Sequence, residues 1–304
     1  PGSAVETALL TVAGLCGLGI PAALVEIARR HTYLDPYDVV HRPGLNEELA
    51  ATSVMGSQVA AKVASLSQGR DGVVGYWYGK APGLDRATDA LRHANIIGTH
   101  PTGGAVALVG DDPGAKSSTV PCASEMSLAD LYMPILYPAD SQDILDLGVH
   151  AAIMSRVSGL WTSLKISAHV ADGSSTADVH PDRILPVYGD LGTSPHVPSG
   201  QLLGAKLMEL EQNQLTVRMP RATEYARINR LNRITVRSSD DRIGIARIQS
   251  GQLRAKPGPY APAPAQMVRE EGRALLCSPA QRSHIAHQHA RAHRRAIDYV
   301  AMAP

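Results

Sequence analysis

A regular alternation of strand-like and helix-like segments between residues 71 and 170 most constrains the fold of this chain. Short apolar runs, of the kind buried on both faces of a parallel sheet, occur at 72–77, 105–109, 134–137 and 160–170. Helical patterns or helix-start signals lie between them, at 85–97, 127–132 and 140–157. This repetition predicts an α/β fold with a mostly parallel sheet, flanked by helices and joined by right-handed crossovers.

Another helix is predicted to begin at residue 47. Pro43 and Gly44 are turn residues, and Asn46 is a favourable N-cap. Glu47 and Glu48 follow in the first turn, where the helix dipole favours negative charge. The apolar and small residues beyond them recur at helical spacing. On these patterns alone, Glu47 is most simply explained as a carboxylate of the capping turn.

Polar and glycine-rich segments follow three of the predicted strands. They cover residues 78–80, 110–119 and 138–140. In parallel α/β sheets, ligands bind beyond the carboxyl ends of the strands. We therefore expect a ligand at this edge of the sheet, near Gly79, Lys80 and the segment 110–119.

The segment 110–119 is open to more than one interpretation. Asp111 and Asp112 are adjacent carboxylates, but they point to different sides of an extended chain, and no His or third carboxylate is suitably spaced for a metal site. An Asx-type turn that holds the backbone amides of Ser117 and Ser118 is the favoured interpretation. Lys116 and the two serines resemble the end of a phosphate loop, but the Walker spacing is missing, which argues against binding of a nucleoside triphosphate.

The two ends of the chain differ from its middle. A glycine-rich turn at 14–21 precedes a helical pattern, and its glycines serve either packing or phosphate binding. After residue 251 the chain becomes Pro-rich and then basic and His-rich, a composition typical of a stiff linker and a poorly ordered tail. In that tail His289 and His293 have the i,i+4 spacing of metal ligands, but no acidic residue accompanies them.

The turn-rich stretch 171–200 is the best candidate for a domain boundary. Beyond it, helices are predicted at 201–215 and 221–230 and strands at 232–236 and 243–248. We therefore predict three parts. A first domain covers residues 1–185, a connector with the start of a second α/β unit covers 186–251, and the linker and tail cover 252–304.

Charge and cysteine content narrow the class of protein. The formal net charge of +1 gives no global field that would favour nucleic acid. Three scattered cysteines form no CxxC pair, which argues against a zinc ribbon, an iron–sulfur cluster or a disulfide framework within this chain, and favours a cytoplasmic location. The apolar run at 8–20 is too short and too rich in glycine to span a membrane.

Five segments, taken together and in register, resemble the indolepyruvate:ferredoxin oxidoreductase family, within the thiamine-diphosphate-dependent 2-oxoacid:ferredoxin oxidoreductases. They are PGLNE at 43–47, YWYGKAPGLDR at 76–86, HAN at 93–95, GDDP with KSST between 110 and 119, and PDR at 181–183. The resemblance covers about residues 1 to 250. It implies that residues 1–185 form an aminopyrimidine-binding (Pyr-type) domain.

The resemblance also implies roles for particular residues. In the family, a glutamate hydrogen-bonds N1′ of the aminopyrimidine ring of the cofactor, and the matching residue is Glu47. A carboxylate in that place promotes removal of the C2 proton of the cofactor. We therefore predict Glu47 as the catalytic residue and no metal ligand in this chain. The predicted cofactor-binding residues are Asn46, Glu47, Gly79, Lys80, Asp111, Asp112, Ser117 and Ser118.

The implied activity is oxidative decarboxylation of a 2-oxoacid, with electrons passing to ferredoxin. Mg²⁺ and [4Fe–4S] clusters are expected from a complementary thiamine-diphosphate-binding domain or subunit, and dimerisation is expected because Pyr-type domains bind the cofactor at an interface. The loop at 17–21 lacks the Tyr and Ser of the family pattern, and the diphosphate-binding half has no counterpart in this sequence. The chain is therefore expected to be inactive alone, and a non-catalytic structural or assembly module is the alternative.

Overall fold

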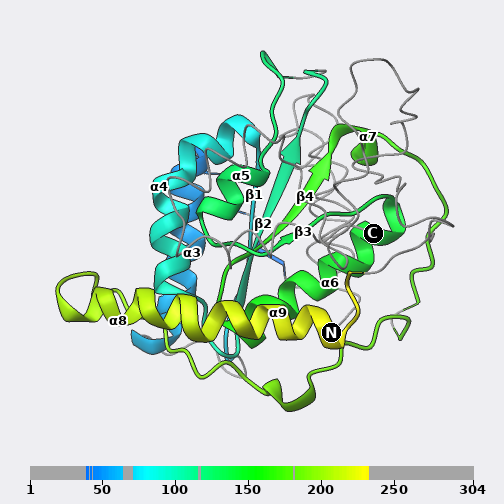
Figure 1. Ribbon diagram of the computed structural model, residues 1–304. Helices are drawn as coiled ribbons and strands as arrows, with labels where there is room; N and C mark the ends of the chain where they lie inside the picture. The colour runs from blue at the N-terminus through cyan, green and yellow to red at the C-terminus, as the bar shows by residue number, and fades with distance from the viewer. Residues whose placement is uncertain are drawn as a thin grey trace, which may run out of the picture.

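A four-stranded, all-parallel sheet lies at the centre of the protein (Figure 1). The structure is a computed structural model that describes residues 39–40, 42, 44–63, 71–115, 118–180 and 182–232. The strands have the spatial order β1-β2-β4-β3. Their bounds are β1 (Val74–Lys80), β2 (Gly104–Asp111), β3 (Ile135–Leu136) and β4 (Thr162–Ser167). The predicted α/β class and parallel sheet are confirmed.

Helices cover both faces of the sheet. One face packs against α3 (Glu47–Val63), α4 (Ala81–Ile97) and α5 (Glu125–Asp130), and the other against α6 (Ser141–Ser158). After β4 come α7 (Ala168–Ala171) and the short turn η3 (Gly189–Leu191). A last long helical rod crosses the amino ends of the strands (Figure 1) and is made of α8 (Ala205–Asn213), a π-helical turn η4 (Gln214–Arg218) and α9 (Met219–Ile228).

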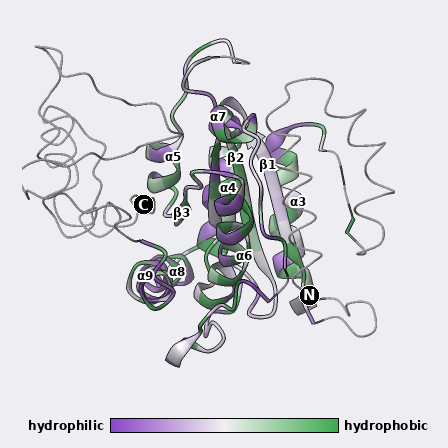
Figure 2. Ribbon diagram, turned by 90° about the vertical axis from the view of Figure 1, so that its right-hand side faces the viewer, coloured by the Kyte–Doolittle hydropathy of each residue, from purple (hydrophilic) through white to green (hydrophobic). Residues whose placement is uncertain are grey.

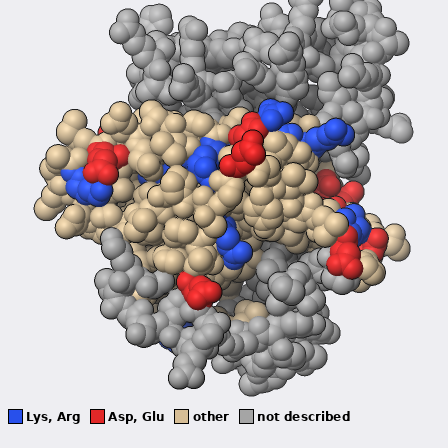
Figure 3. All heavy atoms as spheres, turned by 90° about the horizontal axis from the view of Figure 1, so that it is seen from below, with Lys and Arg blue, Asp and Glu red and all other residues tan. Residues whose placement is uncertain are grey.

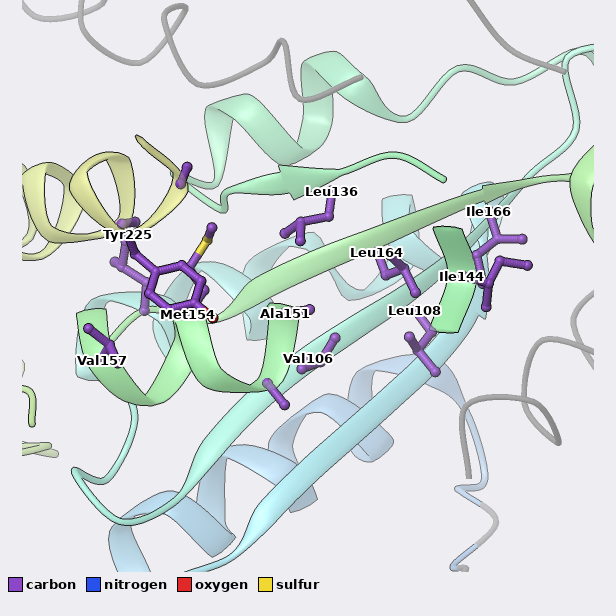
Figure 4. Packing of buried hydrophobic residues seen from close by; sticks show 14 of the residues in the cluster. Val106, Leu108, Leu136, Ile144, Ala151, Met154, Val157, Leu164, Ile166 and Tyr225 are labelled. Atoms are coloured by element: carbon purple, nitrogen blue, oxygen red, sulfur yellow. The ribbon is translucent and has the colours of Figure 1, made fainter. Parts of the chain in front are cut away.

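The apolar core is divided between the two faces of the sheet. Alternate residues of β2 enter opposite clusters, so that Val106 and Leu108 pack against α6 and α9, whereas Ala105 and Ala107 pack against α3, α4 and α5. Figure 4 shows the first cluster, with Tyr225 of α9 over the α6 side of the sheet. In Figure 2 the apolar residues concentrate on the strands and on the inner sides of the flanking helices. Burial on both faces explains why the strands read as continuous apolar runs.

Several predicted boundaries differ from the observed ones. The loop expected at 78–80 is instead the end of β1, and α4 begins at once, at Ala81, with Pro82 in its first turn. Proline is favoured there because its ring fixes φ and its missing N–H has no partner in the first turn. The caps were predicted correctly: Asn46 Oδ1 accepts the N–H of Leu49 at 2.9 Å, and Asp140 Oδ1 accepts that of Asp143 at 2.9 Å.

Other predictions concern regions that the structure does not describe. The glycine-rich turn at 14–21, the strands at 232–236 and 243–248, and the linker and tail after residue 251 lie outside the described residues. The division into domains at residue 186 stays a prediction. Among the described helices, none combines the length and the apolar character that crossing a bilayer requires. The face in Figure 3 carries small groups of both signs of charge between uncharged areas.

Arg218 joins the final helical rod to the rest of the fold. Its guanidinium is fully buried and donates to backbone carbonyl oxygens at the end of α4, those of Asn95 at 2.8 Å and Ile96 at 3.0 Å, and to Leu210 O at 3.1 Å. The last carbonyl groups of a helix have no partner within the helix. Arg218 therefore supplies the missing donors for α4 from a segment more than a hundred residues away in sequence.

We expect Arg218→Met to lower the free energy of unfolding by about 3–5 kcal/mol, because several buried carbonyl groups lose their donor at once. Arg227→Met is the matched control, since Arg227 lies on the same helical rod and pairs with Glu224 at the surface; it should leave the free energy of unfolding nearly unchanged. Urea denaturation measures both. Equal losses in the two variants would contradict the role given to Arg218.

The buried His150 makes the stability of the fold depend on pH. Its ring is buried on α6, with Nδ1 2.9 Å from Tyr225 Oη, and burial lowers its pKa to about 4. Below about pH 6.5 the unfolded chain takes up a proton at this residue that the folded chain does not, so stability falls by about 1.4 kcal/mol per pH unit down to about pH 4. The unfolding free energy of His150→Gln should fall less steeply over that range in urea titrations. The same slope as in wild type would refute this assignment.

Candidate functional site

The carboxyl ends of the strands meet at one edge of the sheet, and the chain leaves this edge in two directions. After β2 it passes to α5 on the face covered by α3 and α4, whereas after β3 it passes to α6 on the opposite face. Strand β4 lies between these two strands. Such a topological switch point opens a crevice in which open α/β sheets bind their ligands. The end of β4 therefore lies at the expected ligand position.

Glu47 lies at the start of α3, next to the neighbouring part of this edge. Its backbone is fixed because Trp77 of β1 donates its indole N–H to Glu47 O at 2.9 Å. Its side chain, in contrast, is 41% exposed, and among the described residues its ion pair is a long one, with 3.9 Å between Oε2 and Arg86 Nε. The backbone is thus held firmly while the carboxylate stays accessible to a ligand.

Gly83 allows the Glu47 side chain to lie against the first turn of α4. A Cβ atom at position 83 would stand 2.7 Å from Glu47 Cγ and 3.0 Å from its Oε1, so a side chain there would force the partly exposed Glu47 side chain to move away. Gly79 is constrained more strictly, because its Cβ would stand 2.8 Å from the ring of Trp77, which is buried. The glycines of the YWYGKAPG motif shape the surroundings of Glu47 and Trp77.

A second polar cluster lies at the end of β4, around Lys165. The lysine side chain is fully buried, and its ammonium pairs with Asp111 Oδ2 at 3.0 Å and, more closely, with Glu125 Oε1. It also lies 4.3 Å from the centre of the Tyr137 ring. Asp111 in turn accepts both the backbone N–H and the hydroxyl of Ser124, at 3.3 and 3.2 Å. One buried cation therefore joins the ends of β2 and β4 to the start of α5.

Buried hydroxyl groups occur on this cluster and on the loop that follows β2. The hydroxyls of Tyr137 and Ser167 are near each other but do not form a well-aligned hydrogen bond. The hydroxyl of Ser118 is also buried without a partner in the described structure. Burial, together with the nearby carboxylates of Glu125 and Asp111, raises the pKa of Tyr137 well above its ordinary value. The Tyr137 phenol therefore stays protonated and able to donate a hydrogen bond at neutral pH.

The register of the sheet relates the predicted residues to the Lys165 cluster. Gly79, Val109 and Lys165 lie side by side on three neighbouring strands. Because neighbouring strands are about 4.8 Å apart, the backbones at Gly79 and Lys165 lie roughly 10 Å from each other across the sheet. Lys80 lies one residue farther along, level with Gly110. The structure thus brings Gly79, Lys80 and Asp111 to one edge.

The structure has a turn after Asp112, where the Asx-type turn is predicted, but the bonds that define it are made by the backbone. The main-chain carbonyl oxygen of Asp112 accepts the N–H groups of Ala115 at 3.1 Å and Cys122 at 3.3 Å. Asp111 does not take part, because its carboxylate is buried against Lys165 instead. Ser117 lies outside the described residues. Sequence analysis failed to single out Lys165 and Glu125, although a lysine within the apolar strand segment was a signal for a buried ionic partner.

Over the described ranges, no group of three or more His, Cys, Asp or Glu side chains is arranged to hold a metal ion. No family model matches the sequence. The chain is similar to the indolepyruvate oxidoreductase subunit IorA of Methanothermobacter marburgensis, with 25% identity over 207 residues. It is also 25% identical over 212 residues to the subunit of the same name from Methanothermobacter thermautotrophicus.

In both comparisons the match covers 68% of this chain and 32% of the relative, so the chain spans about a third of the length of these curated relatives. Both relatives carry the family name that the five sequence segments predict. The resemblance of this chain to the indolepyruvate oxidoreductase family is thereby confirmed at the level of distant homology.

Proposed function

We propose that this chain is the aminopyrimidine-binding part of a thiamine-diphosphate-dependent 2-oxoacid:ferredoxin oxidoreductase with an indolepyruvate-like substrate. The observation that carries the proposal is the setting of Glu47. Its backbone is fixed by Trp77, its side chain lies against Gly83, and its carboxylate stays accessible. This is the arrangement that a carboxylate needs to hydrogen-bond a ring nitrogen of a flat heterocycle supplied from outside.

The surroundings of Glu47 fit the proposed cofactor. The missing side chain at Gly83 lets the Glu47 side chain lie against the start of α4, and the long separation from Arg86 leaves the carboxylate oxygens available as acceptors. When bound, thiamine diphosphate supplies the carbanion chemistry and the electron sink that decarboxylation of a 2-oxoacid requires. The role of Glu47 is to hold a proton at the ring nitrogen, and Asn46 orients Glu47 by capping α3.

The remaining proposed cofactor residues have different degrees of access. Gly79 and Lys80 end β1 next to α4, and Asp112 and Ser118 belong to the loop that follows β2. Asp111 is fully buried, so it acts on this site through the loop and not by touching a ligand. Ser117 stays a proposed cofactor-binding residue because of its place in the KSST motif, since it lies outside the described residues.

The surface around Glu47 supports a partner that completes the site. Leu45 is 94% exposed and Leu49 about half exposed, on either side of Glu47. We propose that these two apolar side chains are covered by a partner. This partner is a complementary diphosphate-binding domain or subunit, which would contribute Mg²⁺ and the [4Fe–4S] clusters that pass electrons to ferredoxin. The complex is proposed to be cytoplasmic and to contain more than one copy of the chain.

The second candidate function is a structural or assembly module without catalysis. The observation that favours it is the loop at 17–21, which lacks the Tyr and Ser of the family pattern. Both candidates require association with a complementary subunit, but only the first requires cofactor binding. Calorimetry therefore separates them.

In isothermal titration calorimetry, thiamine diphosphate with Mg²⁺ should give a binding isotherm with the chain mixed with its complementary subunit, and a weaker one or none with the chain alone. This is expected because an interfacial site is complete only in the complex. Sedimentation of the same mixture shows whether the complex forms. A complex that forms but gives no binding heat would establish the assembly module in place of the enzyme.

Glu47→Gln should leave the unfolding free energy within about 0.5 kcal/mol of wild type, because the side chain is half exposed and its ion pair is long. Exchange of the C2 proton of bound cofactor, followed by NMR in the complex, should slow by about 100-fold or more. Glu48→Gln is the matched control, since Glu48 is the next residue of the same turn and is exposed. Equal exchange rates in the two variants would exclude the role of Glu47.

A further inference from the structure

We infer that Lys165 is a positioning residue that holds together the two ends of the loop that joins β2 to α5 at the carboxyl edge of the sheet. Asp111, the last residue of β2, precedes the loop, and Glu125, the first residue of α5, follows it. The ammonium of Lys165 pairs with both carboxylates. A single side chain on β4 thus fixes the two points between which the loop is anchored.

The contacts around Asp111 close the base of the loop further. Asp111 accepts the backbone N–H and the hydroxyl of Ser124, so the two ends of the loop also contact each other directly. Within the loop, the carbonyl oxygen of Asp112 accepts the N–H groups of Ala115 and Cys122. These bonds tie the middle of the loop back to its first residue. The loop therefore has an ordered base whose central element is Lys165.

The charges of the Lys165 cluster are buried and must therefore be balanced within the protein. The side chains of Lys165 and Asp111 have no exposed surface, and that of Glu125 is 13% exposed. A buried lysine needs carboxylate partners to remain charged, and each carboxylate in turn needs donors. Loss of one carboxylate partner therefore releases the end of the loop at which that partner stands. Glu125 is the partner at the edge of the cluster, and its removal leaves the pair between Lys165 and Asp111 intact.

The loop lies where a ligand of the sheet is expected. It leaves β2 at the carboxyl edge and leads to α5 (Figure 1), and β4 is the strand beside β2. The unpartnered buried hydroxyls of Ser118, Tyr137 and Ser167 lie on the loop and at the strand ends around Lys165. We assign this loop to contact with the cofactor, a step that rests on the proposed function. The anchoring of the loop does not depend on it.

The test compares two variants of α5 in the full chain. Glu125→Ala removes the anchor at the downstream end of the loop. Asp130→Ala is the matched control, because Asp130 lies on the same short helix but forms an exposed ion pair with Arg92 at 2.6 Å. Lys165→Met is less suitable, since it would leave two buried carboxylates without a cation.

Hydrogen exchange followed by mass spectrometry should show exchange at Ala115, Cys122 and Ser124 at least about tenfold faster in Glu125→Ala than in wild type, because their hydrogen bonds depend on the anchored base. Exchange within α6 should not change in either variant. Asp130→Ala should leave the loop as in wild type. Unchanged loop exchange in Glu125→Ala would overturn the anchoring role.

Calorimetry of the complex with its complementary subunit tests the second step. The affinity for thiamine diphosphate with Mg²⁺ should fall at least about tenfold in Glu125→Ala and stay unchanged in Asp130→Ala, because a mobile loop must be ordered on binding. Faster loop exchange with unchanged affinity would overturn the assignment of the loop to the cofactor. Absence of binding by wild type would overturn the proposed function instead, and the exchange rates alone would then decide the role of Lys165.

Discussion

The burial of one ammonium group inside a parallel sheet constrains the carboxyl edge of that sheet. Lys165 has no exposed side-chain surface, so its charge must be balanced by groups of the protein itself. The structure meets this need with Asp111 from β2 and Glu125 from α5. Because these carboxylates stand at the two ends of one loop, balancing the charge of Lys165 also determines where that loop begins and ends.

A second buried cation has a comparable role at the opposite edge of the sheet. Arg218 donates to carbonyl oxygens at the end of α4 and to Leu210 of its own helical rod. Lys165 is balanced by carboxylates, whereas Arg218 is bonded to backbone oxygen atoms that would otherwise lack donors. Figure 1 shows the consequence: the helical rod of α8 and α9 lies across the amino ends of the strands, away from the carboxyl ends. The rod therefore does not cover the carboxyl edge of the sheet.

The sequence predicted the class of fold well because the relevant signals are local. The apolar runs of β2 and β4 and the caps Asn46 and Asp140 depend on neighbouring residues alone. The site was less predictable because its contacts are distant in sequence. Lys165 and Glu125 are 40 residues apart, and the Glu47 side chain lies against Gly83 of a different helix. A pattern of residue types carries no information on such pairings.

Glu47 and Lys165 represent two different uses of charge on the same face of the sheet. The carboxylate of Glu47 is accessible and only weakly paired, so its interactions change readily when a ligand arrives. The ammonium of Lys165 is sealed and strongly paired, so it serves to fix geometry. Under the proposed function the two groups are complementary, because an accessible carboxylate is most effective when the loop beside it is already held in place. Backbone pairing across three strands, from Gly79 through Val109 to Lys165, links the surroundings of Glu47 to the Lys165 cluster.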